Sequence, residues 1–187
     1  MSVSKVTICN NALSMIGGQQ IASFEEDTKL AQTCRNLYDT TRLSILRSHP
    51  WSCAKKRQIL SPVTTYPSFG YAHAFPLPSD YVLIISANTE RYEVENRYIL
   101  ADTEVVYLEY VFDNDNEQTW DAMLVQTLTY KMASELCKPV TGSDAAGQSA
   151  EEKFQFLIKQ ARTVNGQERP SQDVQFAESS YYWERFQ

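Results

Sequence analysis

The sequence predicts an α+β protein: a four-helix bundle with an inserted small antiparallel β domain and an extended C-terminal tail. Helical periodicity of apolar residues occupies both ends of the chain, and a stretch rich in proline, aromatic and β-branched residues separates them. We therefore assign residues 1–60 and 113–165 to the helical bundle, residues 61–112 to the inserted β domain, and residues 166–187 to the tail.

Apolar residues at helical spacing predict the first helix: Val6, Cys9, Leu13 and Ile16. Ser2 or Ser4 is a suitable N-terminal cap, and the pair Gly17-Gly18 is typical of a helix end.

A second helix follows the acidic run 25–27, in which Asp27 is a plausible cap, and extends to about Ser48. Its apolar stripe is Leu30, Cys34, Leu37, Thr41 and Ile45. It must end at His49-Pro50, because the residue before a proline avoids the helical region.

Prolines 62, 67, 76 and 78 exclude a long helix from the next stretch. Segments of strand-like composition cover residues 82–87, 91–94, 97–100 and 104–112. Glu95-Asn96 has the composition of a tight hairpin turn, and we expect a second turn at Asp102-Thr103.

Two more helical stripes follow the polar loop 113–116. The third helix carries Trp120, Leu124, Leu128, Met132 and Leu136 on one face and is expected to end before Pro139. The fourth begins near Ser143-Asp144 and directs Ala150, Phe154, Leu157, Ile158 and Ala161 inward.

The formal net charge of -6 argues against a free-standing binder of duplex DNA, which would carry a basic stripe. Cys9, Cys34, Cys53 and Cys137 are scattered and form no metal-binding motif, so we expect no metal and no cofactor. The N-terminus lacks a signal-peptide pattern, and no apolar run reaches membrane-spanning length. The pattern favours synthesis in a reducing cytosol, without a membrane partner.

No nucleotide-binding or hydrolase motif is present, so we do not expect an enzyme. Asp113, Asp115 and Glu117 alternate as in a calcium loop but lack its glycine and closing glutamate, which favours a solvated, helix-capping acidic loop. Carboxylates also cluster at residues 25–27 and at Glu151-Glu152, both at predicted helix starts, where the helix dipole accounts for them.

One segment, LYDTTRLSILRSHPWSCAKKRQIL at residues 37–60, carries the clearest family signal. Its pattern resembles that of the head-to-tail adaptor proteins of short-tailed bacteriophages, the tail tubular protein A family. The matching positions are Leu37, Tyr38, Arg42, Leu46, Arg47, His49, Pro50, Trp51, Ala54, Arg57 and Leu60. Residues 71–82 and 119–143 are similar to the same family, with an added Leu77-Pro78 step and with Cys137 where a small residue is usual.

The resemblance implies a structural virion protein at the head–tail connector. Such a protein forms a homo-oligomeric ring of twelve copies that joins the portal protein to the tail nozzle protein and lets genomic DNA pass. Lys55, Lys56 and Arg57 are candidate contacts for DNA phosphate in the channel, although a solvated strand edge explains three basic residues equally well.

The C-terminal tail holds four aromatic residues: Tyr181, Tyr182, Trp183 and Phe186. Rigid aromatic side chains are typical binding anchors, so they either fold back on the chain's own core or dock on another chain. We favour docking, because the C-terminal extensions of the adaptor family reach the portal. An alternative function is a small cell-wall-degrading tail hydrolase with carboxylate catalysis, and a third is a bacterial cytosolic interaction domain.

Overall fold

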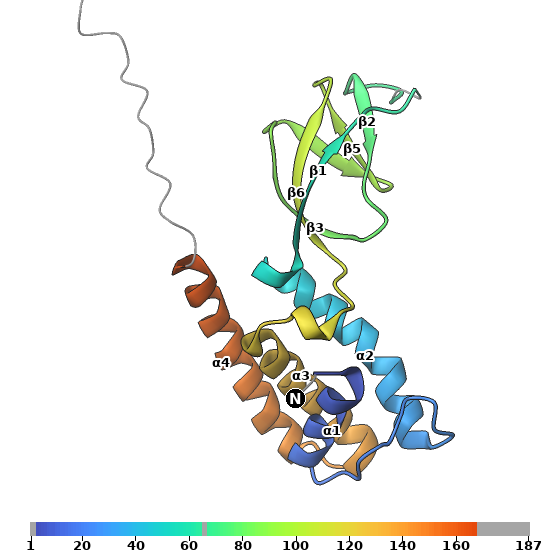
Figure 1. The fold of residues 1–187 in the computed structure, drawn as a ribbon, viewed down its shortest axis with the longest axis vertical. Coiled ribbons are helices and arrows are strands. Elements are labelled where there is room, and N and C mark those ends of the chain that lie inside the picture. The colour runs from blue at the N-terminus through green and yellow to red at the C-terminus, as the bar shows by residue number, and fades with distance from the viewer. Residues whose placement is uncertain (1–2, 65–66, 168–187) are drawn as a thin grey trace, which may run out of the picture.

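A computed structural model describes residues 3–64 and 67–167 of the chain. Within these ranges it is an α+β protein with four α-helices and two three-stranded antiparallel sheets. Figure 1 shows the helices gathered at one end of an elongated molecule and the two sheets, which we call the β module, at the other. The helices are α1 (Lys5–Met15), α2 (Lys29–Ser48), α3 (Ala122–Thr141) and α4 (Ala145–Gln167), with 3-10 turns η1 (Ser52–Ala54) and η2 (Glu117–Thr119).

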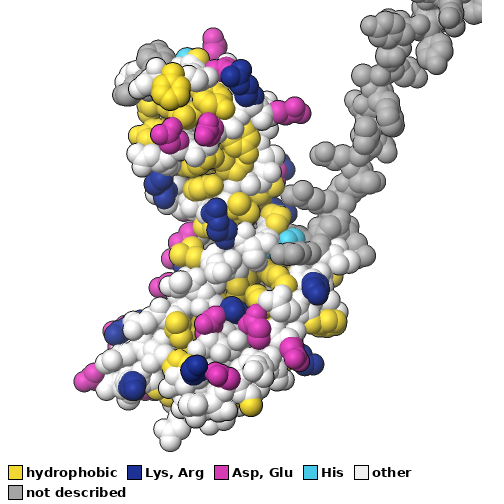
Figure 2. Space-filling model, turned by 180° about the vertical axis from the view of Figure 1, so that it is seen from behind, with side chains coloured by type: hydrophobic (Ala, Val, Ile, Leu, Met, Phe, Trp, Pro, Cys, Tyr) yellow, Lys and Arg dark blue, Asp and Glu magenta, His cyan; other side chains and the backbone are white. Residues whose placement is uncertain are grey.

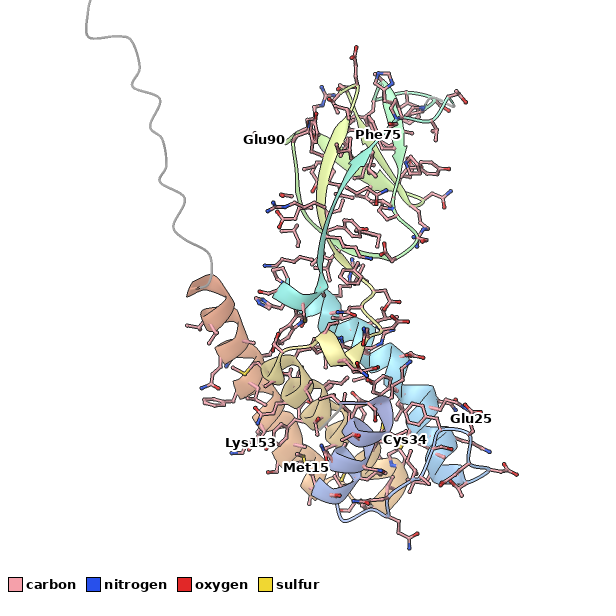
Figure 3. The ribbon with its side chains drawn as sticks, in the orientation of Figure 1. Met15, Glu25, Cys34, Phe75, Glu90 and Lys153 are labelled. Atoms are coloured by element: carbon pink, nitrogen blue, oxygen red, sulfur yellow. The ribbon has the colours of Figure 1, made fainter. Side chains whose placement is uncertain are left out.

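The helical part is arranged around α3, which contacts each of the other three α-helices. Gly147 allows α4 to approach α3 closely, because a Cβ at this position would lie 2.9 Å from the Cβ of Cys137. Most residues of the predicted apolar stripes of α1, α2 and α3 are buried, although Val6, Leu30 and Leu37 are only half-buried. Cys9 and Cys34 are fully buried where α1 meets α2, and Figure 3 labels Cys34 there. Phe154 and Leu157 of α4 are only half-buried, while Ala150, Ile158 and Ala161 are buried as predicted.

Six strands make the two sheets: β1 (Lys55–Leu60), β2 (His73–Pro76), β3 (Tyr81–Ala87), β4 (Tyr92–Glu95), β5 (Tyr98–Ala101) and β6 (Val106–Phe112). The first sheet has the order β1-β6-β3 and the second β2-β5-β4. The β1 strand lies before residue 61, where the sequence placed the start of the β domain, because its pairing with β6 carries the sheet back to Lys55.

The hairpin predicted between residues 91 and 100 is present, but its turn lies one residue later than the predicted Glu95-Asn96. Strands β4 and β5 pair through Glu95 and Tyr98, and the two linking residues, Asn96 and Arg97, have φ angles of 44° and 66°. Asn tolerates this left-handed conformation well, which makes it a suitable residue for a two-residue hairpin. The second predicted hairpin turn, Asp102-Thr103, is wrong: this segment connects β5 of one sheet to β6 of the other.

Two hydrophobic clusters stabilise the molecule. The larger cluster fills the helical part, and the smaller one lies between the two sheets around Phe75, which Figure 3 shows inside the β module. Val82 of β3 and Val111 of β6 belong to the larger cluster, while the neighbouring Tyr110 belongs to the smaller one. Strands β3 and β6 therefore pack in both parts of the molecule.

Two predicted helix ends are wrong. The cap of α2 is Thr28, whose side-chain oxygen accepts a hydrogen bond from the amide of Ala31 at 3.2 Å, whereas Asp27 accepts one from the side chain of Gln32. Helix α3 continues through Pro139 to Thr141, because a proline in the last turn removes only one helical hydrogen bond. The helix then closes on Gly142, at φ 70°, whose amide donates to Lys138.

The predicted tail falls largely on residues 168–187, outside the described ranges, while Gly166 and Gln167 are the last two residues of α4.

Candidate interaction sites

The helical part and the β module are joined by a polar cluster on α2. Arg42 is only 4% exposed, and its guanidinium group forms an ion pair with Asp113 and donates a hydrogen bond of 3.0 Å to the carbonyl of Asn114. Asp39, one helical turn earlier, lies 3.6 Å from the same guanidinium group. Buried arginine requires such partners, since an unpaired buried charge is costly. Arg42 therefore fixes the loop that leaves β6 onto the helix.

Tyr38, one turn before Arg42, continues the same cluster. The hydroxyl group of this fully buried residue donates a hydrogen bond of 3.1 Å to the carboxylate of Glu117. Burial raises the pKa of Tyr38, and the negative charge of Glu117 raises it further, so the phenol stays protonated. The prediction that this loop is a solvated acidic loop is wrong for Glu117, which is buried against α2, whereas Asp113 pairs with Arg42 and keeps part of its side chain exposed.

Asn114 organises the loop from within. Its side-chain amide donates to the carbonyl of Cys53 at 2.7 Å and to the hydroxyl oxygen of Thr119 at 2.8 Å, and it accepts from the amide of Asn116 at 3.1 Å. These bonds satisfy the polar atoms of a residue that is 4% exposed. The loop is thereby tied both to η1 and to η2.

Two further residues of the segment 37–60 secure the end of α2. Arg47 donates a hydrogen bond of 2.6 Å to the carbonyl of Val82 on β3. The indole nitrogen of the buried Trp51 donates one of 3.0 Å to the carbonyl of Ile45, which satisfies a free carbonyl at the helix end. Trp51 belongs to the larger hydrophobic cluster. The junction cluster, defined here as Tyr38, Arg42, Arg47, Asp113, Asn114 and Glu117, thus uses three of the residues that carry the family resemblance.

The basic triplet lies at the start of β1, where its charges have acidic neighbours. Lys56 forms an ion pair of 2.7 Å with Asp80 and lies 3.8 Å from the ring centre of Phe112, and Arg57 lies 3.7 Å from Glu109. Lys55 is half-buried. On the face shown in Figure 2, lysine and arginine side chains are scattered among acidic ones and do not form a stripe.

Asp80 is held by two donors. Burial by itself would raise its pKa, but the hydrogen bonds from Lys56 and from the hydroxyl group of Tyr110 outweigh burial and hold the pKa below its usual value. Burial and the neighbouring Asp80 raise the pKa of Tyr110 to about 12. The triplet therefore takes part in contacts within the β module, which reduces the positive charge that it presents to solvent.

The two carboxylate clusters lie apart. Glu25 is exposed on the connection between α1 and α2, and Figure 3 places it on the opposite side of the helical part from Lys153, which is near Glu151 and Glu152 on α4. Glu26 accepts the amide of Ala22 at 2.7 Å, so it orders that connection.

Glu151 lies 3.0 Å from Lys131 of α3 and contributes to helix packing. The two clusters therefore do not face each other across a shared cleft, the arrangement that catalysis by two carboxylates requires.

Among the described residues, no group of three or more His, Cys, Asp or Glu side chains is placed to hold a metal ion. None of the described helices is both long enough and apolar enough to cross a membrane. The four aromatic residues predicted to bind the portal, Tyr181, Tyr182, Trp183 and Phe186, lie outside the described ranges.

No protein-family model matches the chain, and no curated protein matches it either. The likeness to the phage adaptors therefore rests on the motif residues themselves.

Sequence reasoning singled out the α2 half of the junction cluster through the resemblance, but it missed the partners. Asp113 and Asn114 are 71 and 72 residues away from Arg42, and Glu117 is 79 residues away from Tyr38. Two features were available as a signal: an arginine and a tyrosine one turn apart on a helix, and a later run of acidic and amide residues. Only the fold shows that these segments meet.

Proposed function

We propose that the chain is a structural virion protein, a head-to-tail adaptor that joins the portal protein to the tail nozzle protein of a short-tailed bacteriophage. In this proposal the four helices form a bundle that is the body of a twelve-copy ring, the β module is inserted as a separate contact surface, and the C-terminal tail docks on the portal. Genomic DNA passes through the ring, and the protein resides at the head–tail connector.

The observation that carries the proposal is the role of the segment 37–60. Its family-like residue Arg47 contacts β3, and Tyr38 and Arg42 make buried contacts with the segment that leads from β6 to α3. A connector subunit has to transmit force between head and tail, and a rigid joint between its two parts suits that task. The acidic net charge of -6 is compatible with a channel wall that releases DNA, since few exposed cations mean few phosphate contacts.

No observation favours the alternative, a cell-wall-degrading hydrolase. Of its candidate carboxylates, Glu26 and Glu151 bind neighbouring groups of the fold, and the two clusters lie apart. The proposed adaptor function also accounts for an aromatic tail. The entropy cost of ordering each tail on the portal would be compensated by the many identical contacts of a ring.

The test is assembly with purified portal rings. The full chain should bind the portal and appear as a ring under it by electron microscopy, and the free chain should be a monomer by light scattering. Removing residues 178–187 should abolish attachment, and Trp183→Ala should weaken it by about 2 kcal/mol per copy. Full attachment of the shortened chain would contradict the role of the tail, and no attachment of the intact chain would contradict the function itself.

A further inference from the structure

A hollow of about 390 Å³ opens where three elements meet: the connection from α2 to β1, the start of α3 and the last turns of α4. We call it the α4 hollow. Its lining includes Trp51, Cys53, Trp120, Met123, Ala161 and Val164. Figure 1 shows α4 running along α3 toward the level of the α2–β1 connection, which brings its last turns to this place.

The walls of the α4 hollow are incompletely covered. Val164 is 46% exposed although it belongs to an apolar lining. Trp120 is 8% exposed, and its indole nitrogen is buried without a hydrogen-bond acceptor among the described residues. This nitrogen has almost no accessible surface, so the hollow offers an occupant mainly apolar surface, and an apolar group that covers Val164 would be stabilised here.

The chain itself supplies such a group at the right place. Helix α4 ends at Gln167, one helical turn beyond Val164, so the remaining twenty residues begin beside the hollow. Their last seven residues include two tyrosines, a tryptophan and a phenylalanine, together with Arg185. The hollow presents one carboxylate, Asp121, which could pair with that arginine.

We infer that the α4 hollow is the docking site for the aromatic end of the chain's own C-terminal tail in the free protein. In this arrangement, side chains of Trp183 or Phe186 fill the apolar part of the hollow. The inference concerns the unassembled chain and does not depend on the virion function. If that function holds, the portal competes with the hollow for the same aromatic residues.

Docking within one molecule is favoured by the length of the connecting segment. Thirteen residues, 168–180, separate Gln167 from Tyr181, and a random coil of thirteen residues has a root-mean-square span of about 20 Å. Because the segment starts beside the hollow, the effective concentration of the tail is on the order of a millimolar. The tail of a second copy, present at micromolar concentration, therefore competes poorly for the hollow.

Cys53 is a natural reporter for occupancy of the hollow. It lines the hollow and is half-exposed, while Cys9, Cys34 and Cys137 are 0%, 0% and 1% exposed. Maleimide should therefore label Cys53 first, and Cys53→Ser should remove that fast reaction. The other three thiols stay protected only while the chain is folded, so their protection serves as an internal control in every variant.

Deleting residues 178–187 should accelerate labelling of Cys53 about sixfold, the protection expected if the tail at about 1 mM binds with a dissociation constant of about 0.2 mM. Trp183→Ala combined with Phe186→Ala should act in the same direction. Equal labelling rates in the intact and shortened chains would overturn the inference. Protection that grows when the chain is concentrated from about 1 to 100 μM would assign the occupant to a second copy and overturn docking within one molecule.

Val164→Glu provides the matched test, because it places a charge in the hollow at a position that is already half-exposed. It should accelerate labelling in the intact chain and have no further effect in the chain lacking residues 178–187. Phe156→Glu is the control, since Phe156 is a 58% exposed residue of the same helix outside the hollow, and it should change neither rate. Equal acceleration by Val164→Glu in both chains would mean a change in the hollow itself and would overturn the inference.

Discussion

The helical part and the β module are stabilised in different ways. The helical part encloses a large apolar core to which all four α-helices contribute, whereas the core between the two sheets consists of eight buried residues among those described. Two small three-stranded sheets with so little buried surface are marginal by themselves. We therefore expect the β module to depend on its contacts with the helical part, through Val82, Val111 and the junction cluster.

That dependence suggests why a polar cluster is buried at the joint. Apolar contacts alone are non-directional and would tolerate several orientations of the β module. The ion pair of Arg42 with Asp113 and the hydrogen bond of Tyr38 to Glu117 require one arrangement, because a displaced partner leaves a buried polar group unsatisfied. We therefore expect the joint between the helical part and the β module to be stiff.

The largest effect is expected from Phe75→Ala. Phe75 is fully buried in the small core, and removing a buried phenylalanine side chain costs about 3–5 kcal/mol. The β module should unfold while the helical part remains, which hydrogen exchange would detect as fast exchange in β2, β5 and β6 with slow exchange retained in α1 and α3. Tyr107→Ala, at a 55% exposed position of the same module, is the control. Equal loss of protection in the helices would show one cooperative unit.

Arg42→Met should lower the free energy of unfolding by about 2–3 kcal/mol. The carbonyl of Asn114 would lose its donor, but the side chain of Asp113 is 38% exposed, and water can compensate part of its loss. Chemical denaturation gives the value. The matched control is Arg57→Met, because the side chain of Arg57 is 83% exposed and forms only a long ion pair. This variant should lower the free energy of unfolding by less than about 0.5 kcal/mol. Similar costs for the two variants would refute a special role of the junction.

Tyr38→Phe should cost about 1 kcal/mol, because it removes one hydrogen bond to Glu117 while keeping the buried ring. Combining it with Arg42→Met should give less than the sum of the single effects, since both residues hold the same loop. Denaturation of the two single variants and the double variant measures this coupling. Additive effects would mean that the two contacts act independently.

The sequence was informative about elements and less so about their partners. Helical spacing, Ser4 and Gly17 predicted α1 correctly because the signals are local. Pro139 misled the prediction of α3, since the cost of a proline depends on how many helical bonds follow it, and here the helix ends two residues later.

The turn at Asp102-Thr103 was also misread, because turn composition does not tell whether the flanking strands pair with each other. Glu117 looked solvated because its partner, Tyr38, lies far away in the sequence, and no local pattern reports such a contact.

The smallest effect is expected from Asp80→Asn, and it should depend on pH. The bonds from Lys56 and Tyr110 hold the pKa of Asp80 below that of the unfolded chain, which is about 3.9. A lowered pKa in the folded state means that the charged carboxylate stabilises the fold above about pH 4, and that this contribution is lost as the pH falls through the lower, folded-state value. Because the ion pair is partly exposed, the gain near neutral pH should be below about 1 kcal/mol.

Urea unfolding of the wild type and Asp80→Asn from about pH 2.5 to pH 6 checks this expectation, with the two stabilities converging at the acidic end. Asp115→Asn, an exposed residue of the loop after β6, should follow the wild type throughout. A difference between wild type and Asp80→Asn that stays constant across the range would show that the lost contact is not the charged carboxylate. In that case Asp80 would contribute only hydrogen bonds whose strength does not depend on pH. The edge strand β1 would then be held by the contact of Lys56 with the ring of Phe112.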